Sequence, residues 1–217
     1  MINILYEDNH ILVVLKPVNI PVCEDESKDL DLLNMLKKYL KEKYDKKGNV
    51  YLGLVHRLDR PVSGVMVFAK TSKAASRLSK QVSNHILKKE YHAVVIGKLD
   101  KGRFEDKLLK NNKTNISKVD KNGKLAILDY ESLKYDKKNN YSLVKINLKT
   151  GRSHQIRVQF SHHNHPLIGD NKYNNVEIKK IPVALFASSL TFNHPITNES
   201  LTFSYNLPDN YPWNLFK

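Results

Sequence analysis

The stretch His56-Arg57-Leu58-Asp59-Arg60-Pro61-Val62-Ser63-Gly64, followed by the apolar run Val65-Met66-Val67-Phe68-Ala69, decides how the chain can fold. The apolar run is typical of a buried strand, and the proline and glycine before it predict a tight loop. Asp59 lies in that loop between two arginines, and nearby positive charge keeps a carboxylate ionised at neutral pH. An ionised carboxylate suits a base or a nucleophile. Taken alone, an aspartate in a turn is more often a cap for the backbone.

The elements on either side of this loop are mixed. Leucines at three- and four-residue spacing predict a helix over residues 29–44, and Ser72 is a suitable N-cap for a second helix. Strand-like runs lie at residues 2–6, 11–16, 91–96, 125–135, 141–148 and 183–192, with a hairpin through residues 136–140. The polar, Lys/Asn-rich residues 106–122 are predicted to loop over the surface. Interspersed helices and strands with a hairpin-like second half predict an α+β fold, and the length favours one domain over residues 1–217.

A second dense run of functional residue types is Thr150-Gly151-Arg152-Ser153-His154-Gln155-Ile156-Arg157-Val158-Gln159-Phe160. If the residues from Ser153 onward are helical, His154 and Arg157 share one face at three-residue spacing, while Ile156 and Phe160 share another at four. One side of the helix would then gather polar groups. The alternative is a solvated basic helix face.

Charge and cysteine content bound the class of protein. Lys and Arg total 36 against 22 Asp and Glu, so a net charge of +14 favours a polyanionic partner such as nucleic acid, or else reflects a Lys-rich composition throughout. The single cysteine, Cys23, excludes an intrachain disulfide. No apolar stretch approaches the ~20 residues of a membrane span. His162, His163 and His165 lack the spacing and companions of a metal site. We expect a cytoplasmic monomer without cofactor, metal or membrane contact.

Three ordered motifs resemble the signatures of the RluA-type pseudouridine synthases. They are His56-Arg57-Leu58-Asp59 with Ser63-Gly64 and Ala69-Lys70, then Lys89-Glu90-Tyr91 with Ala93 and Gly97, then Thr150-Gly151-Arg152 with His154-Gln155-Ile156-Arg157. Lys16-Pro17 resembles the segment that precedes them, and Gly169-Asp170 with Tyr173, then His194-Pro195, resemble the closing segments. The match keeps the family order from about Ile4 to Pro208. It implies an α+β domain with a long mixed, mostly antiparallel β-sheet flanked by helices and loops.

The resemblance implies an enzyme that isomerises uridines in structured rRNA or tRNA after flipping the base. Asp59 would attack the ribose C1′ or abstract a ribose proton. Tyr91 matches the active-site tyrosine that stacks on the base, and Arg157 matches the arginine that pairs with the aspartate. Arg57 matches the arginine that fills the space of the flipped nucleotide. The further substrate-binding residues implied by the motifs are His56, Leu58, Arg60, Arg152, His154, Gln155, Ile156, which would pack near the uracil, and Lys16.

Some positions depart from the family pattern. Val62 stands where the family commonly has Thr, and Leu185-Phe186-Ala187 replaces a typical Leu-His-Ala. We expect a stand-alone catalytic domain without the N-terminal S4-type domain that many relatives carry. One alternative is a catalytically silent RNA-binding or assembly factor on the same fold. Another is a hydrolase that uses Asp59 with His56 or His154, which predicts a second acid or a metal cluster in the motifs, and neither is seen in the sequence.

Overall fold

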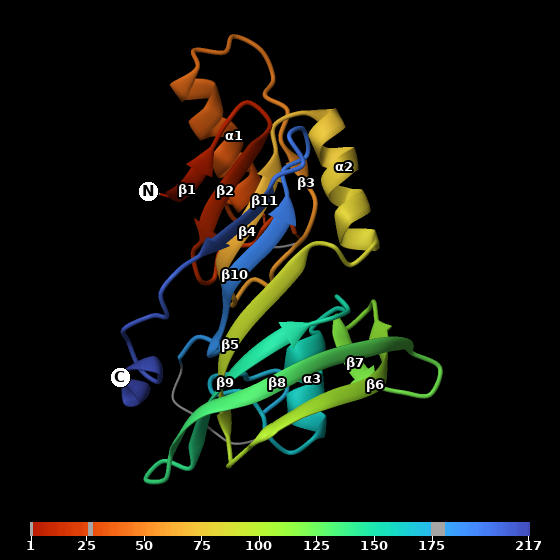
Figure 1. Cartoon of the computed structure of the whole chain (residues 1–217), viewed down its shortest axis with the longest axis vertical. Helices are drawn as coiled ribbons and strands as arrows, with labels where there is room; N and C mark the ends of the chain where they lie inside the picture. Colours follow the sequence, from red (N-terminus) through yellow and green to blue (C-terminus); the bar gives the residue numbers. More distant parts are fainter. Residues whose placement is uncertain (1, 26–27, 175–180) are drawn as a thin grey trace. The chain divides into compact units, whose positions relative to one another are not determined.

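The computed structural model describes residues 2–25, 28–174 and 181–217, and the chain divides into two compact units (Figure 1). Unit 1 comprises Met1–Leu87 and Ser189–Tyr205, and unit 2 comprises Lys88–Ser188 and Asn206–Lys217. Each unit contains β-strands and at least one α-helix, and the strands belong to one long sheet, which confirms the predicted α+β class. None of the helices in the described ranges is long and apolar enough to cross a membrane.

The sheet of unit 1 fixes the end of the Asp59 loop. Strand β2 (Ile11–Lys16) pairs antiparallel with β1 (Asn3–Glu7) on one side and with β4 (Ser63–Ala69) on the other. The register places Lys16 opposite Gly64, where the loop enters β4. The sheet is extended by β3 (Gly53–Leu54) on β4, by β10 (Leu185–Asn193) next to β4, and by β11 (Ser200–Ser204) on β10.

Two helices of unit 1 follow the predicted apolar spacing. Helix α1 (Leu32–Lys43) buries Leu32, Leu36 and Leu40, which confirms an amphipathic helix here. The predicted start at residue 29 is wrong, because Leu30 lies before the helix and is 65% exposed. Helix α2 (Ser72–Ser83) is capped by Thr71, whose side chain accepts from the Ala74 N–H at 3.1 Å, so the prediction of Ser72 as the cap is wrong by one residue.

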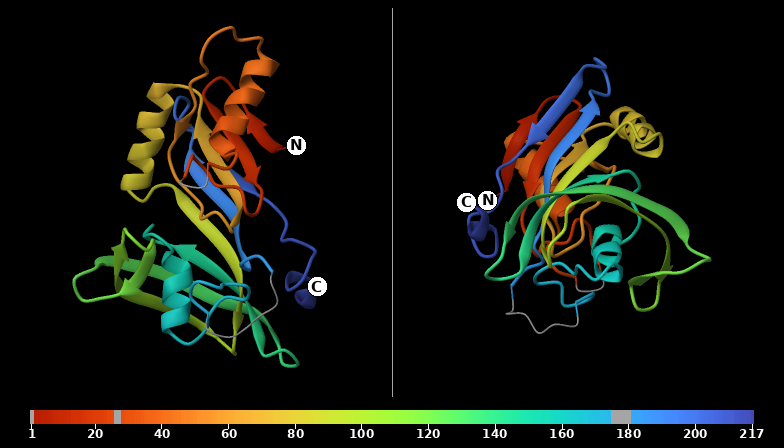
Figure 2. Two further views of the ribbon diagram at one scale, coloured as in Figure 1. Left: turned by 180° about the vertical axis from the view of Figure 1, so that it is seen from behind. Right: turned by 60° about the horizontal axis from the view of Figure 1, so that its bottom comes forward.

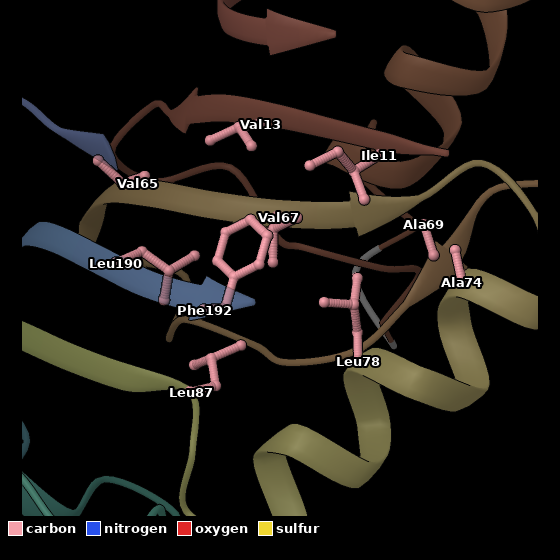
Figure 3. Packing of buried hydrophobic residues seen from close by; sticks show 10 residues of the cluster. All are labelled: Ile11, Val13, Val65, Val67, Ala69, Ala74, Leu78, Leu87, Leu190 and Phe192. Carbon is pink, nitrogen blue, oxygen red and sulfur yellow. The ribbon is translucent and has the colours of Figure 1, made fainter. Parts of the chain in front are cut away.

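The core of unit 1 lies between α2 and the sheet (Figure 3). Ala74 and Leu78 of α2 pack with side chains of β4 and β10, and the whole cluster shields β4 from water. The buried members of the cluster are Ile11, Val13, Val65, Val67, Ala69, Ala74, Leu78, Leu87, Leu190 and Phe192. Burial of this apolar surface gives the strand that follows the Asp59 loop a fixed position.

Unit 2 is built on strands of the same sheet, which pair antiparallel in the order β5-β9-β8-β6-β7. The strands are β5 (Lys88–Ile96), β6 (Lys101–Asn111), β7 (Ile116–Val119), β8 (Lys124–Asp136) and β9 (Tyr141–Leu148). Helix α3 (Gln155–His162) lies against β6 and β7, as the two views of Figure 2 show. The hairpin between β8 and β9 is confirmed, and Asn140 completes its turn with φ 56°. A 3₁₀ helix, η1 (Trp213–Phe216), closes the chain.

The prediction of a surface loop over residues 106–122 is wrong. Most of this segment lies in β6 and β7, which pair with each other, and β6 also pairs with β8. Its lysines and asparagines face solvent, while Phe104 and Leu108 are buried four residues apart. Asp106 stands between them and accepts from Gln159 at 2.7 Å, so a polar side chain interrupts the apolar alternation that would have indicated a strand.

Candidate active site

The Asp59 loop is fastened to β4 by main-chain contacts. The Val62 N–H donates to the Asp59 main-chain oxygen at 3.0 Å, so the carbonyl of Asp59, and not its carboxylate, closes the predicted turn. His56 lies just before the loop, and its Nε2 accepts from the Val67 N–H at 3.1 Å. Leu58 and Val62 are buried, whereas Arg57 is exposed. Buried residues on both sides of Asp59 thus hold the loop in place, and Asp59 itself is half-buried.

The side chain of Lys16 holds this loop through hydrogen bonds. Its side chain is 0% exposed, and Nζ donates to the carbonyl oxygens of Pro17 at 2.9 Å, Arg60 at 3.0 Å and Val62 at 2.7 Å. Burial lowers the pKa of Lys16 to about 7, against the opposing charge of Asp59 and with a smaller lowering by Arg60. Three carbonyl acceptors match the three N–H bonds of an ammonium group. Sequence reasoning singled out Lys16 as a substrate-binding residue, and its described contacts are with two carbonyls of the Asp59 loop and with the carbonyl of Pro17.

Arg60 is directed toward a neighbouring segment of unit 1. Its guanidinium hydrogen-bonds to Asp29, lies 3.8 Å from a carboxylate oxygen of Asp25 and donates to the Asn19 main-chain oxygen at 3.3 Å. The side chain is 43% exposed, so these ion pairs contribute modestly to stability. They give the outer side of the loop a second attachment.

The loop before α3 is organised by Gln155. Its Oε1 accepts from Thr150 Oγ1 at 2.8 Å and from the Arg152 N–H at 3.0 Å, while Nε2 donates to Gln159 at 3.0 Å. The side chain of Arg152 donates to the Leu125 main-chain oxygen at 2.8 Å. The predicted helix is confirmed from Gln155 onward. Gln155 itself is buried and fastens the loop that leads into the helix.

His154 lies outside the helix, contrary to the prediction that the helix begins at Ser153. It is the N-cap residue with φ 55°, in the left-handed region that non-glycine residues rarely adopt. Its Nδ1 lies 2.6 Å from the Tyr173 hydroxyl, whose oxygen accepts from the Ser117 N–H at 2.9 Å. The Tyr173 hydroxyl therefore bridges the Ser117 N–H and the His154 ring. This bond fixes the orientation of the imidazole ring.

Arg157 is a buried cation of unit 2 and pairs with Asp170. The side chain is 5% exposed, so the alternative of a solvated basic helix face is wrong. Nε and Nη2 donate to the two carboxylate oxygens of Asp170, both at 2.7 Å, and the Tyr173 ring lies 5.2 Å from the guanidinium carbon. Sequence reasoning did not find Asp170 as a partner, although Gly169-Asp170 with Tyr173 was noted as a segment. Ile156 is buried beside Arg157 on the helix.

Tyr91 lies in β5 opposite Ile146 of β9 and is 6% exposed. Lys89 precedes it by two residues on the same strand. Asp59 belongs to unit 1, whereas Tyr91 and Arg157 belong to unit 2. The predicted meeting of these three side chains stays a prediction, as do their roles in binding and catalysis.

Comparison with known proteins places the sequence among characterised families. The family described as RNA pseudouridylate synthase matches residues 10–162. Ribosomal large subunit pseudouridine synthase D of Vibrio cholerae is 34% identical over 226 residues, covering 96% of this chain and 68% of that protein. tRNA pseudouridine synthase C of Yersinia pestis is 32% identical, covering 98% of this chain and 88% of that protein. The structure titled Human RNA Pseudouridylate Synthase Domain Containing 4 superposes with a TM-score of 0.79 at 23% identity, over 95% of this chain and 88% of that one, which shows a shared fold.

Proposed function

The chain belongs to the RNA pseudouridylate synthase family, and we propose that it isomerises specific uridines of structured rRNA or tRNA to pseudouridine. The family name denotes an isomerase, and the two RNA classes come from the names of the bacterial relatives. In this reaction the bond between C1′ and N1 breaks, and a bond between C1′ and C5 forms. C5 loses a proton and N1 gains one, so the base changes its attachment and nothing else is consumed. The proposal includes one catalytic domain over residues 1–217, acting as a cytoplasmic monomer.

The observation that carries the proposal is that hydrogen bonds hold the Asp59 turn in place. The turn is closed by a main-chain bond at 3.0 Å, and Lys16 fastens its far side through the Arg60 and Val62 carbonyls. A group held in this way loses little conformational freedom when it reacts. The carboxylate is not required for the closing bond of the turn. We assign to it the attack on C1′ or the abstraction of a ribose proton.

We assign to Arg157 the binding of the Asp59 carboxylate. The pair with Asp170 uses Nε and one hydrogen of Nη2, so the Nη1 amino group and the second Nη2 hydrogen lie on another edge of the planar guanidinium. A guanidinium can therefore bind two carboxylates through two edges. In the proposed reaction the second edge keeps Asp59 ionised and oriented.

Tyr91 and Arg57 are assigned to the flipped nucleotide. Extruding a base from a helix costs a few kcal/mol, and the enzyme must offset this cost. Stacking on the ring of Tyr91 contributes ~1–3 kcal/mol per base. The exposed Arg57 enters the gap that the base leaves in the RNA, and the net charge of +14 adds an attraction for phosphates that weakens with salt.

The test uses RNA labelled with tritium at C5 of uridine. Total RNA is prepared from a strain that lacks this protein and is incubated with the purified chain. Since isomerisation displaces the C5 hydrogen, we expect tritium in the water, and carbodiimide-based sequencing then maps the modified positions. Binding of RNA without tritium release would contradict the proposal and support a silent binding factor.

A further inference from the structure

Lys89 and Tyr91 leave the same face of β5. The register between β5 and β9 runs without a shift from Lys89 to Ile96, so side chains two residues apart point the same way. Glu90 points to the opposite face and forms an ion pair with Lys145 at 2.8 Å. The ammonium group of Lys89 therefore belongs to the face that carries the proposed base-stacking tyrosine.

Lys89 is close to the loop that precedes α3. A Cβ atom placed on Gly151 would lie 4.0 Å from Lys89 Nζ, so the absence of a side chain at this glycine leaves the ammonium group uncovered on that side. The loop around Gly151 is held by Gln155 through the hydroxyl of Thr150 and the N–H of Arg152. The surroundings of Lys89 Nζ are thus ordered by the third sequence motif.

The charge of Lys89 is poorly compensated. Within residues 2–25, 28–174 and 181–217, no hydrogen-bond acceptor or carboxylate pairs with its Nζ, whereas Lys16 has three carbonyl acceptors. Burial lowers the pKa of Lys89 because the charged form loses hydration. A half-buried ammonium group without a counter-charge costs stability, and groups of this kind cluster at functional sites.

We propose that Lys89 binds the detached uracil, donating from its ammonium group to a carbonyl oxygen of the base. The inference rests on the proposed function. When the C1′–N1 bond breaks, both electrons stay on the base, and the negative charge spreads over N1 and the carbonyl oxygens. The charge disappears when C5 bonds to C1′, as the bond from C1′ to the Asp59 oxygen breaks or as the ribose carbon regains its proton from Asp59. C5 then loses its proton to water and N1 gains one. It arises equally if Asp59 attacks C1′ or abstracts a ribose proton.

A cation placed at this position accelerates the reaction more than it tightens binding. The uracil of the bound substrate is neutral, so Lys89 gains its strongest interaction only after bond cleavage begins. An RNA phosphate is the other anion that a lysine could bind. Phosphate contacts come mainly from exposed side chains that track the backbone, whereas Lys89 is half-buried on the face of Tyr91. These features favour the base over the phosphate.

The test compares Lys89→Met with Lys88→Met. Methionine keeps the apolar stem and removes the charge, and Lys88 is the exposed neighbour on the opposite face of β5. With a C5-tritiated substrate that the wild-type protein modifies, we expect kcat of Lys89→Met to fall ~100-fold. KM should stay within about twofold. Lys89→Arg should retain part of the activity, and Lys88→Met should match the wild type.

A second substrate separates charge stabilisation from support of the fold. RNA with 5-fluorouridine at the target position yields a more stable base anion, because fluorine withdraws electrons. Since fluorine cannot leave C5 as a proton, the product is the isomer that keeps fluorine at C5 and carries the ribose there. Loss of Lys89 should slow formation of this isomer less, as measured by chromatographic separation and mass spectrometry of the nuclease-digested RNA. Equal slowing of both substrates would overturn the proposal.

Three further outcomes would also overturn it. A raised KM with unchanged kcat and a weaker salt dependence would identify a phosphate contact. Full activity of Lys89→Met would leave the residue without a role. Absence of tritium release by the wild-type protein would contradict the proposed function, and this proposal with it.

Discussion

Arg157 and Asp170 form a buried, two-bonded ion pair, with Nε and Nη2 each 2.7 Å from one carboxylate oxygen. Asp170 is 1% exposed, and one of its oxygens also accepts from the Lys172 N–H at 3.1 Å. The pair orients the guanidinium plane, and the ring of Tyr173 lies over it at 5.2 Å. The edge of Arg157 that is assigned to Asp59 is therefore set by residues that follow α3 in the chain.

Removing the charge of Asp170 should destabilise the protein. Asp170→Asn replaces one acceptor by a donor facing Arg157 Nε, and breaking a buried ion pair costs about 3 kcal/mol. Urea denaturation measures the change in the free energy of unfolding. Asp129→Asn is the matched control, because Asp129 pairs with Arg103 at 2.6 Å on the surface, where the loss should stay below about 1 kcal/mol. Equal losses in the two variants would contradict this account of Arg157.

Lys16→Met should lower kcat by roughly tenfold or more, because a loosened Asp59 turn holds the carboxylate less accurately. It also leaves three carbonyl oxygens without their donor, which should lower the free energy of unfolding by about 2 kcal/mol. Lys70→Met is the control, since the side chain of Lys70 is 11% exposed and pairs with Glu7 at 2.7 Å, at the opposite end of β4 from the turn. Both variants should lose stability, but only Lys16→Met should lose tritium release measured well below its unfolding transition.

Tyr91→Ala should reduce kcat/KM by roughly tenfold to a hundredfold, because the base loses a stacking surface worth ~1–3 kcal/mol. Tyr91→Phe keeps the aromatic face and should keep the stacking contribution. Tyr135→Ala removes an exposed tyrosine of the same unit and should leave kcat/KM unchanged. An alanine variant of Tyr91 as active as the Tyr135 variant would argue against base stacking.

The lowered pKa of Glu7 predicts that the free energy of unfolding depends on pH. Burial alone would raise the pKa of Glu7, but hydrogen bonds from Lys43, Lys70, Tyr44 and Tyr39 outweigh it and lower the pKa from 4.5 to about 2. Because the folded-state pKa is the lower one, the stabilisation is present above pH 4.5 and is lost as the pH falls toward 2. With screening at the partly exposed Lys43, it amounts to about 2 kcal/mol.

The measurement is the difference in unfolding free energy between the wild type and Glu7→Gln. The difference should be present at pH 6 and shrink steadily below pH 4.5. Glu42→Gln is the control, because Glu42 is 67% exposed and pairs with Lys38 only at 3.8 Å. A difference that did not change with pH would contradict the assignment of the pKa shift to Glu7.

The parts of the fold that follow an apolar period could be predicted from the sequence. Leucines of α1 form one buried stripe of that helix, and the apolar run forms the buried strand β4. The segment of β6 and β7 could not be recognised, because its outer face is solvated and Asp106 interrupts its inner face. Local periodicity carries no signal for a polar side chain that is buried through a partner on another element.

The sequence motifs predict the residues of the candidate site, and these residues stay a prediction, but the motifs did not predict the contacts that hold them. The motifs pointed to Asp59, Tyr91 and Arg157, yet the bond from Arg157 to Asp170 joins positions that no periodic pattern relates. The left-handed backbone of His154 was also unexpected, because it depends on the contact between the His154 ring and the Tyr173 hydroxyl. Such contacts depend on how the chain packs in three dimensions.

The central claim is that Asp59 is the reacting carboxylate, and Asp59→Asn tests it most directly. Asparagine keeps the size of the side chain and the main-chain bond to Val62, so the variant should fold. Asp45→Asn, at an exposed position in unit 1, is the control. With C5-tritiated RNA, the Asp45 variant should release tritium at the wild-type rate and the Asp59 variant should release none above background. Tritium release by a folded Asp59→Asn protein at a rate near that of the wild type would contradict the claim.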